Sequence, residues 1–418
     1  ELAGRREDRE RDELKEIHRA LSPAELERLR QDADALRHLQ ETAEDLSCLP
    51  TLERRDIPPE VEIISPGAAE PDGRTVAYDQ ATSGIVYVAA AAGAGGLSEE
   101  LKDLAPFFCY AFSRVGTAFR DYADMARRID AVTGGIGLAL HPRTGFDGAG
   151  DCIPFVALNA KCLKRNFSPT ADLLAELLQH YDFSDLPRLK SLLLEYRSGL
   201  ESMVIHNGHR LAMSLAARHF SAARFLNEHW SGVHHLLRMK RLTEAPVEER
   251  LAEVAAGLAE IGRQVWLQPN FQAAVIGETD VLPEACGRVH GIASGLPAGG
   301  SAGFGFNGKP PAPSRIREGW STATAVNFVA AAFPAVRLEH ADAPALAVIA
   351  KMLRSLYLHR EIREKGGAYG GFAVYDPEDG VFSLASYRDP QLAATLDVFE
   401  RSGEFIGSGA FDDTDVKE

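Results

Sequence analysis

The sequence predicts an α+β fold, in which a helical-hairpin linker precedes two layered α/β domains. Short apolar runs of the kind found in buried strands alternate with longer runs of helical periodicity. One helical stretch is much longer than the others, and a densely charged helical segment opens the chain. Together these patterns favour a sheet with helices covering one of its faces.

The length and composition agree with a folded protein of several domains. A chain of 418 residues corresponds to two or three domains, and 45% hydrophobic with 25% charged residues is ordinary for such a chain. The 45 Lys and Arg residues against 60 Asp and Glu give a net charge of −15. An acidic chain without a run of about 18 apolar residues is a poor candidate for binding nucleic acid or a membrane. We therefore expect neither as a partner.

The five cysteines are scattered, odd in number and without a C-x-x-C pair. This usage indicates a reducing compartment and argues against a disulfide scaffold. We accordingly expect a bacterial cytoplasm rather than an organellar matrix. The chain begins without Met or an apolar signal segment, so we expect it to be a piece of a longer or processed protein.

Residues 1–60 are predicted to form the helical-hairpin linker. The expected helices are Arg5–Leu21 and Pro23–Glu44. The run from Ser22 to Glu25 is a capping box with Pro at the first helical position, because the Ser oxygen and the Glu carboxylate can satisfy free N–H groups. Repeated prolines from Pro50 to Pro71 then indicate an extended domain boundary.

Residues 61–280 are predicted to form the first α+β domain. The expected strands are short apolar runs: Ile85–Ala91, Gly135–Leu140, Phe155–Asn159 and Gln272–Ile276. The expected helices have apolar residues at helical spacing: Glu99–Phe112, Phe119–Ile129, Thr170–Tyr181, Leu186–Phe220 and Val247–Arg263.

Residues 281–418 are predicted to form a second, shorter α+β domain. A loop is expected at Gly295–Pro313 and a strand at Ala325–Ala332. A helix opening at Asp342 is expected to end at Gly366-Gly367. Strands at Ala368–Tyr375 and Val381–Tyr387 flank the turn signal Asp376-Pro-Glu-Asp-Gly380, which predicts a hairpin.

Two motifs that resemble cofactor sites are better explained as structure. The run Gly303–Gly308 has the glycine pattern of dinucleotide-binding loops, but three prolines follow within five residues and forbid the helix that such a loop requires. This excludes a nucleotide-binding oxidoreductase. Histidines recur at His206 and His209, and again near Glu228 at His229, His234 and His235. Neither H-E-x-x-H nor H-x-x-E-H occurs, so we expect packed or surface histidines and no native metal site.

The strongest candidate for a functional site is the pair Arg363 and Tyr369. A helix ending at Gly366-Gly367 brings Arg363, in its last turn, close to Tyr369 at the start of the next strand. A guanidinium and a phenol are donors suited to a carbonyl oxygen or a developing oxyanion. The glycines around Tyr369 would let another backbone approach closely. On spacing alone, however, an Arg interacting with the helix dipole and a packed Tyr is the stronger interpretation.

Four segments resemble the C-terminal half of the insulinase/pitrilysin metallopeptidases, in particular the presequence protease branch. They are Asp45–Ile57, Leu358–Gly371, Leu384–Pro390 and Ser402–Asp413. Because these segments lie near both ends, the resemblance covers essentially the whole chain. It implies two halves joined by the hairpin, each built of two related α+β domains. Zinc is bound in the other half by an H-x-x-E-H motif, whose Glu activates water.

The resemblance also assigns roles within this chain. The segment Leu104–Phe112, where a zinc helix would lie, has no His or Glu at the required spacing. Residues 61–280 are therefore identified as a degenerate domain without zinc, and residues 281–418 as the substrate-binding domain. The resemblance implies that Arg363 and Tyr369 are the catalytic residues that hold the substrate backbone and help to stabilise the tetrahedral intermediate, with Gly370 beside them in the substrate-binding site. A further stretch of roughly a hundred residues would be expected, so we expect the last domain to be truncated.

The function that follows is a share in a zinc metalloendopeptidase that degrades short unstructured peptides in a closed chamber. The expected partners are the N-terminal zinc-bearing half of the same protein and short peptide substrates. We expect zinc in the parent enzyme, with its ligands outside this chain, and an inactive fragment without cofactor. The alternative is a non-catalytic binding or structural subunit of a processing-peptidase-like complex.

Overall fold

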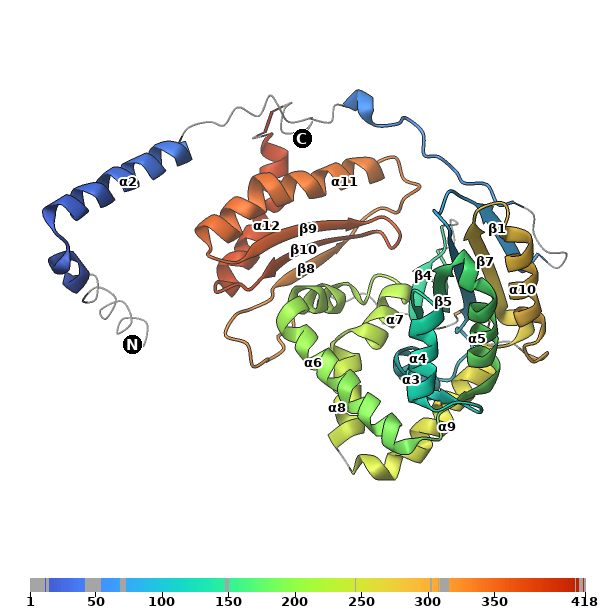
Figure 1. The fold of residues 1–418 in the computed structure, drawn as a ribbon. Coiled ribbons are helices and arrows are strands. Elements are labelled where there is room, and N and C mark those ends of the chain that lie inside the picture. Colours follow the sequence, from blue (N-terminus) through green and yellow to red (C-terminus); the bar gives the residue numbers. More distant parts are fainter. Residues whose placement is uncertain are drawn as a thin grey trace. The chain divides into compact units, whose positions relative to one another are not determined.

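The computed structural model describes residues 12, 15–41, 54–67, 73–146, 150–244, 246–300, 303–306, 308, 316–409, 411–412 and 416. The chain divides into two compact units, Glu1–Glu62 and Ile63–Glu418. Both kinds of secondary structure are present throughout the larger unit (Figure 1), so the predicted α+β class is confirmed.

The smaller unit contains helix α2 (Pro23–Glu41) and the short 3-10 helix η2 (Arg54–Asp56). Residues 15–20 are helical as well. The predicted capping box is confirmed: the Ser22 N–H donates to Glu25 Oε2 at 2.8 Å, and the Glu25 N–H donates to Ser22 Oγ at 3.3 Å. The rest of the expected hairpin, residues 5–11, 13–14 and 42–44, lies outside the described residues.

The larger unit is built first on a five-stranded sheet. Its strand order is β1 (Thr75–Asp79), β7 (Phe271–Gly277), β2 (Ile85–Gly93), β5 (Cys152–Leu163) and β4 (Ile136–Thr144). Only β1 and β7 pair in parallel; the other neighbours in this sheet are antiparallel. Four of these strands were predicted. The first, β1, was missed because it is only five residues long and two of them are polar.

Helices cover one face of this sheet, as predicted. Alternate residues of β2, such as Val86 and Val88, are buried in the helical core, whereas Tyr87 between them is 38% exposed. Within this core the rings of Phe108, Phe112 and Trp266 contact one another. The helices are α3 (Glu99–Ala111), α4 (Tyr122–Val132), α5 (Phe167–His180), α6 (Leu186–Ala217), α7 (Ala222–Ser231), α8 (Val233–Glu244), α9 (Val247–Val265) and α10 (Leu282–Ser294).

Short elements complete this part: a two-stranded sheet of β3 (Gly116–Thr117) and β6 (Tyr181–Asp182), and the 3-10 turns η3 (Lys164–Asn166) and η4 (Gln268–Asn270). Helix α10 begins just after the predicted boundary at residue 280, yet it contacts β7, β1 and α5 of the first core. The division of the chain into domains 1–60, 61–280 and 281–418 stays a prediction.

A second sheet carries the C-terminal part, in the order β8 (Ala330–Pro334), β10 (Val381–Tyr387) and β9 (Gly370–Asp376), all antiparallel. Helix α11 (Ala343–Met352), the π-helix η5 (Leu353–Lys365) and α12 (Leu392–Ser408) pack on one face, and the C-terminal part of α6 contacts β8 and β10 on the other (Figure 1). The predicted hairpin is confirmed, since β9 and β10 flank the turn at Asp376–Gly380.

The glycine-rich run around Gly303 is a structural loop. The Gly95 N–H donates to the Gly303 carbonyl at 2.9 Å. A Cβ atom added to Gly93 would lie 2.2 Å from the Gly303 backbone, and one added to Gly95 would lie 1.8 Å from the Gly305 oxygen. The glycines are therefore required for two backbones to meet, which is the close-approach role of this residue.

Helix α6 is bent at Asn207, whose φ of −131° and ψ of 25° interrupt the helix. The next residue, Gly208, is buried against the ring of Phe328, which comes from the C-terminal part. A Cβ atom at Gly208 would lie 2.3 Å from Phe328 Cδ2. The bend and the glycine together let α6 lie close to the second sheet.

We predict that Gly208→Ala destabilises the protein by about 1–2 kcal/mol, because the overpacking cost outweighs the gain in helix propensity. The matched control is Gly199→Ala in the same helix, where an added Cβ meets nothing within 4 Å. That control should be neutral or stabilising by up to about 1 kcal/mol. Urea unfolding of both variants measures the difference, and equal midpoints would contradict close packing at Gly208.

Candidate functional site

Helix η5 ends at two glycines, and this ending sets the position of Arg363 relative to Tyr369. Gly367 has a φ of +75°, a conformation that glycine adopts at low cost. Its N–H donates to the Arg363 carbonyl at 3.1 Å, and the Ala368 N–H donates to the Ile362 carbonyl at 3.1 Å. The helix end predicted from the Gly-Gly pair is therefore confirmed.

The structure brings the two predicted site residues together. The guanidinium carbon of Arg363 lies 5.7 Å from the centre of the Tyr369 ring, and the Tyr369 side chain is 65% exposed. Both donor groups are thus accessible from solvent, as contact with a substrate requires. Gly370 lies next to them, opposite Tyr387 in the β9–β10 ladder. The roles of Arg363, Tyr369 and Gly370 stay predictions.

Tyr369 belongs to a chain of aromatic contacts that links β9, β10 and α6. Its ring meets the Tyr387 ring edge-on at 5.7 Å, and its N–H donates to the Tyr387 carbonyl at 3.0 Å. Tyr387 in turn contacts His209 at 4.9 Å, and His209 stacks on Phe372 at 5.2 Å. The candidate site therefore rests on residues from both parts of the larger unit.

His209 is a packed residue, which is one of the two environments predicted for it from the sequence. Burial lowers the pKa of His209, and the neighbouring Arg210 lowers it further. His206, the other histidine considered with it as a metal ligand, is exposed.

The second histidine group is also explained by packing. Glu228 is fully buried, and its Oε1 lies 3.0 Å from His234 Nδ1. His229 stacks on His234 at 5.8 Å, whereas His235 points to the hydroxyl of Tyr196, 2.8 Å away. Within the described residues, no group of three or more His, Cys, Asp or Glu side chains is placed to hold a metal ion.

Helix α3 lies where the family resemblance would put a zinc helix. Its buried residues include Pro106, Phe107, Phe108 and Cys109, and burial raises the pKa of the Cys109 thiol to about 12. These side chains fill the core and do not form a donor set that suits zinc. We therefore assign no zinc chemistry to α3.

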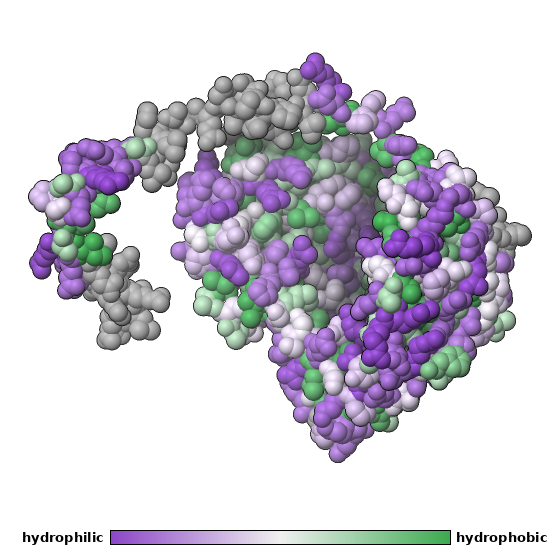
Figure 2. Space-filling view, viewed as in Figure 1, coloured by the Kyte–Doolittle hydropathy of each residue, from purple (hydrophilic) through white to green (hydrophobic). Residues whose placement is uncertain are grey.

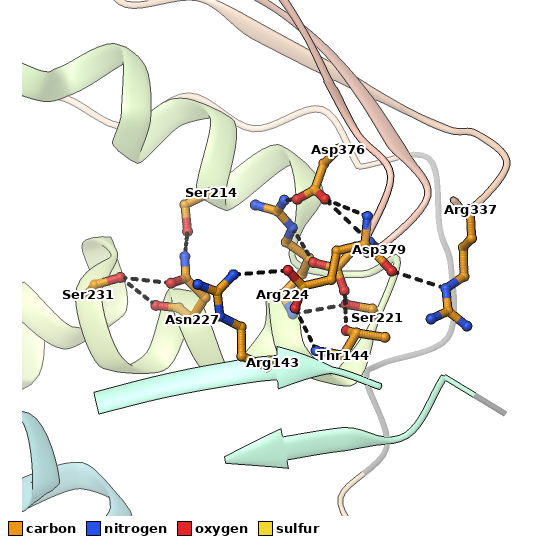
Figure 3. Close-up of polar contacts among 11 residues, drawn as sticks. Arg143, Thr144, Ser214, Ser221, Arg224, Asn227, Ser231, Arg337, Asp376 and Asp379 are labelled. Atoms are coloured by element: carbon orange, nitrogen blue, oxygen red, sulfur yellow. Dashed lines mark hydrogen bonds and ion pairs between the residues drawn. The ribbon is translucent and has the colours of Figure 1, made fainter. Parts of the chain in front are cut away.

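A polar cluster holds the far end of the β9–β10 hairpin (Figure 3). The Asp379 carboxylate accepts hydrogen bonds from Thr144 and Ser221, and its Oδ2 lies 2.7 Å from Arg224 Nε. Asp376 also pairs with Arg224. These partners come from β4 and the start of α7, so the turn of the hairpin is attached to the first part of the unit.

A second set of contacts surrounds the same turn. Glu378 accepts the Thr144 N–H at 2.8 Å and pairs with Arg143 at 2.9 Å. Arg337 donates to the Glu378 carbonyl at 3.0 Å and also to the Gly145 carbonyl. The cluster fixes one end of β9 while the glycine turn after η5 fixes the other.

No role for Arg354, Phe372, Tyr387 or Arg388 was predicted from the sequence. The segment that contains Tyr387 and Arg388 was noted for its resemblance, but without a chemical role. The available signal was the aromatic-cation pair Tyr387-Arg388 at the end of a predicted strand, followed by Asp389-Pro390.

Figure 2 shows a hollow in the surface of the larger unit, between the lobe of the second sheet with its helices and the lobe of the five-stranded sheet. Among the described parts of the chain, no helix is both long and apolar enough to cross a membrane.

Two family models match the chain. The first describes a domain associated with peptidases of family M16, subfamily C, and it matches residues 1–242. The second, described as "PreP C-terminal domain", matches residues 317–417. Together they cover both ends of the chain, including the segment that carries Arg363 and Tyr369.

Curated relatives are presequence proteases. The chain is 31% identical to the mitochondrial presequence protease of Danio rerio over 91% of its own length and 39% of the relative's. It is 28% identical to the mitochondrial presequence protease of Xenopus tropicalis, over 98% and 42% of the two chains. The chain thus spans about two fifths of the length of these relatives. Both relatives are named as mitochondrial proteins, so the expectation of a bacterial cytoplasm was wrong. Cysteine usage indicates only a reducing compartment, and it does not distinguish a bacterial cytoplasm from an organellar matrix.

A solved structure has the same fold. The peptidase M16 inactive domain from Pseudomonas fluorescens superposes with a TM-score of 0.58 at 14% identity, covering 85% of this chain and 81% of the other. The family models, the relatives and this fold agree with one another. The chain belongs to the family associated with M16 peptidases of subfamily C, and it corresponds to the C-terminal half of a presequence protease-type protein of the insulinase family.

Proposed function

We propose that this chain is the non-zinc half of a zinc metalloendopeptidase that degrades short unstructured peptides in a closed chamber. The observation that carries the proposal is the exposed pair of Arg363 and Tyr369 in a chain of this family. The Arg363 guanidinium carbon lies 5.7 Å from the centre of the Tyr369 ring. Peptidases of the family are typically zinc-dependent. The hollow between the two lobes of the larger unit supports the chamber.

In this proposal, Arg363 and Tyr369 hold the peptide backbone at the bond to be cleaved. The guanidinium has five N–H donors and the phenol has one O–H donor, and both can donate to a single carbonyl oxygen. Donation strengthens as negative charge develops on that oxygen, so the pair stabilises the tetrahedral intermediate more than the substrate. Gly370 lets the peptide approach β9 without meeting a side chain.

The proposed partner is the N-terminal zinc-bearing half of the same protein, which supplies the metal ligands from outside this chain. Within this chain we propose a linker at residues 1–60, a degenerate domain at 61–280 and a substrate-binding domain at 281–418. Alone, the chain is expected to be inactive on peptides.

The experiment is cleavage of an unstructured fluorogenic peptide with zinc added, by the chain alone and mixed with the N-terminal half. We expect no activity alone and activity in the mixture. In mixtures that carry Arg363→Ala or Tyr369→Phe, we expect a loss of at least about tenfold, or about 1.4 kcal/mol of transition-state stabilisation.

The matched control is Arg360→Ala, three residues away on the same helix, where Arg360 pairs with Glu361 at 3.0 Å. It should retain activity within about twofold, because the Arg360 side chain is exposed and Glu361 keeps its pair with Lys365. Unchanged activity in the Arg363 and Tyr369 variants would mean that both residues have only a structural role. A folded, assembled mixture that stays inactive would favour the non-catalytic subunit of a processing-peptidase-like complex instead.

A further inference from the structure

Three guanidinium groups lie against three aromatic rings around the candidate site. Arg363 lies over Tyr369, as described. Arg388 lies over Tyr387 with its guanidinium carbon 5.3 Å from the ring centre, and Arg354 lies over Phe372 at 5.4 Å. All three arginines are exposed. Contact with a ring face orients a guanidinium while leaving its N–H donors available in the plane.

The three pairs form one continuous surface, because the rings contact one another. Tyr369 meets Tyr387 at 5.7 Å, and His209 contacts both Tyr387 and Phe372. The cations come from the start of η5, the end of η5 and the residue after β10, and His209 of α6 joins the rings that lie beneath them.

These three guanidinium groups have no ion-pair partner among the described residues, although the chain is acidic overall. The neighbouring carboxylates make contacts of their own: Glu361 pairs with Arg360 and Lys365, and Glu364 Oε1 lies 3.3 Å from His359 Nδ1. The surface therefore presents three guanidinium groups that no carboxylate of the described residues pairs with. Guanidinium recognises carboxylate by two parallel hydrogen bonds.

The backbone holds Arg388 in a strained conformation with a φ of +51°, which is uncommon for a residue other than glycine. The next residue, Asp389, is fully buried. Its carboxylate accepts the Thr395 hydroxyl at 2.6 Å and the Gln391 N–H at 2.7 Å, and its backbone pairs with Asn327. A strained residue that is held in place by many contacts of its neighbours is typical of functional positions.

We propose that Arg388 and Arg354 extend the Arg363/Tyr369 site into a subsite that binds a carboxylate of the peptide. This inference rests on the proposed function. Tyr387 lies 5.7 Å from Tyr369, and an extended chain rises about 3.4 Å per residue, so Arg388 reaches a residue about two positions from the one on Tyr369. The carboxylate is either the free C-terminus of a short peptide or an Asp or Glu side chain.

The test measures direct binding of fluorescently labelled peptides to the unchanged chain and its variants. One peptide pair differs only in a C-terminal carboxylate or amide, and a second pair differs only in one internal Glu or Gln. Arg388→Gly removes the guanidinium and relieves the positive φ, so this variant is expected to fold. Arg354→Gln tests the second cation, and Arg360→Gln is the matched control, since Arg360 is already paired.

We expect at least one carboxylate peptide to bind about tenfold more tightly than its neutral twin. Arg388→Gly should abolish this preference, Arg354→Gln should reduce it, and Arg360→Gln should preserve it. The pair that shows the preference identifies the source of the carboxylate. The proposal is overturned if neither pair shows a preference, or if Arg360→Gln removes it as fully as Arg388→Gly.

Cleavage by the mixture of halves separates this proposal from the proposed function. If Arg363→Ala cleaves normally but Arg388→Gly loses the carboxylate preference, the proposed function fails and the subsite remains as a binding site. If Arg363→Ala loses cleavage while the Arg388→Gly variant binds both members of each pair as the unchanged chain does, only the subsite fails.

Discussion

Asp379→Ala should destabilise the protein by about 2–3 kcal/mol and loosen the β9–β10 hairpin. The Asp379 side chain is 8% exposed, and its carboxylate joins Thr144, Ser221 and Arg224. Removing one partner of a buried ion pair costs about 3–5 kcal/mol. We expect less here, because Arg224 keeps Asp376 and is itself 26% exposed. Urea unfolding gives the change in free energy.

A local readout shows whether the hairpin itself has opened. Cys152 is buried near this cluster, and burial together with the Asp379 charge raises the pKa of its thiol to about 12. Asp379→Ala should label at Cys152 at least about tenfold faster than Asp379→Asn, which removes the same charge but keeps a hydrogen-bonding side chain, with buried Cys109 and Cys286 as internal references. The control is Asp172→Ala, whose partner Arg288 and own side chain are largely exposed, and which should change stability by under about 0.5 kcal/mol. Equal labelling rates in all variants would contradict the conclusion that the contacts of Asp379 hold the hairpin in place.

Acidification to pH 4.5 should reveal a stability loss that originates at His235. This side chain is fully buried, and desolvation lowers its pKa from 6.5 to about 3. Between these values the unfolded chain binds a proton that the folded chain does not, so stability falls as pH falls through this range. At pH 4.5 the loss from this one group is about 2–3 kcal/mol.

The test compares His235→Gln with the unchanged chain by urea unfolding at pH 7 and pH 4.5. Glutamine can still bond the Tyr196 hydroxyl, which lies 2.8 Å from His235 Nε2, but it does not titrate. The variant should lose about 2–3 kcal/mol less stability on acidification. His340→Gln, at an exposed position, should lose as much as the unchanged chain. Parallel losses in His235→Gln and the unchanged chain would rule out His235 as the origin.

Local rules were sufficient for much of the fold. The Asp376–Gly380 turn, the capping box at Ser22 and the helix end at Gly366-Gly367 depend on residues close in sequence, and each is found where it was predicted. Strand β1 was missed because a short, partly polar segment becomes a strand only by pairing with β7, almost 200 residues later. The π-helical form of η5 was not predicted either, since the apolar residues of the segment also fit an ordinary helix.

The candidate site, too, is determined partly by local sequence and partly by tertiary packing. The placement of Arg363 beside Tyr369 follows from local sequence, because only five residues, including the glycine turn, separate them. Long-range packing, by contrast, brings His209 of α6 against Tyr387 and Phe372, whereas Arg388 and Arg354 meet rings that are closer to them in sequence. The His209 contacts join α6 to β9 and β10 across more than 160 residues, and over such a separation local propensity carries no information about which side chains meet.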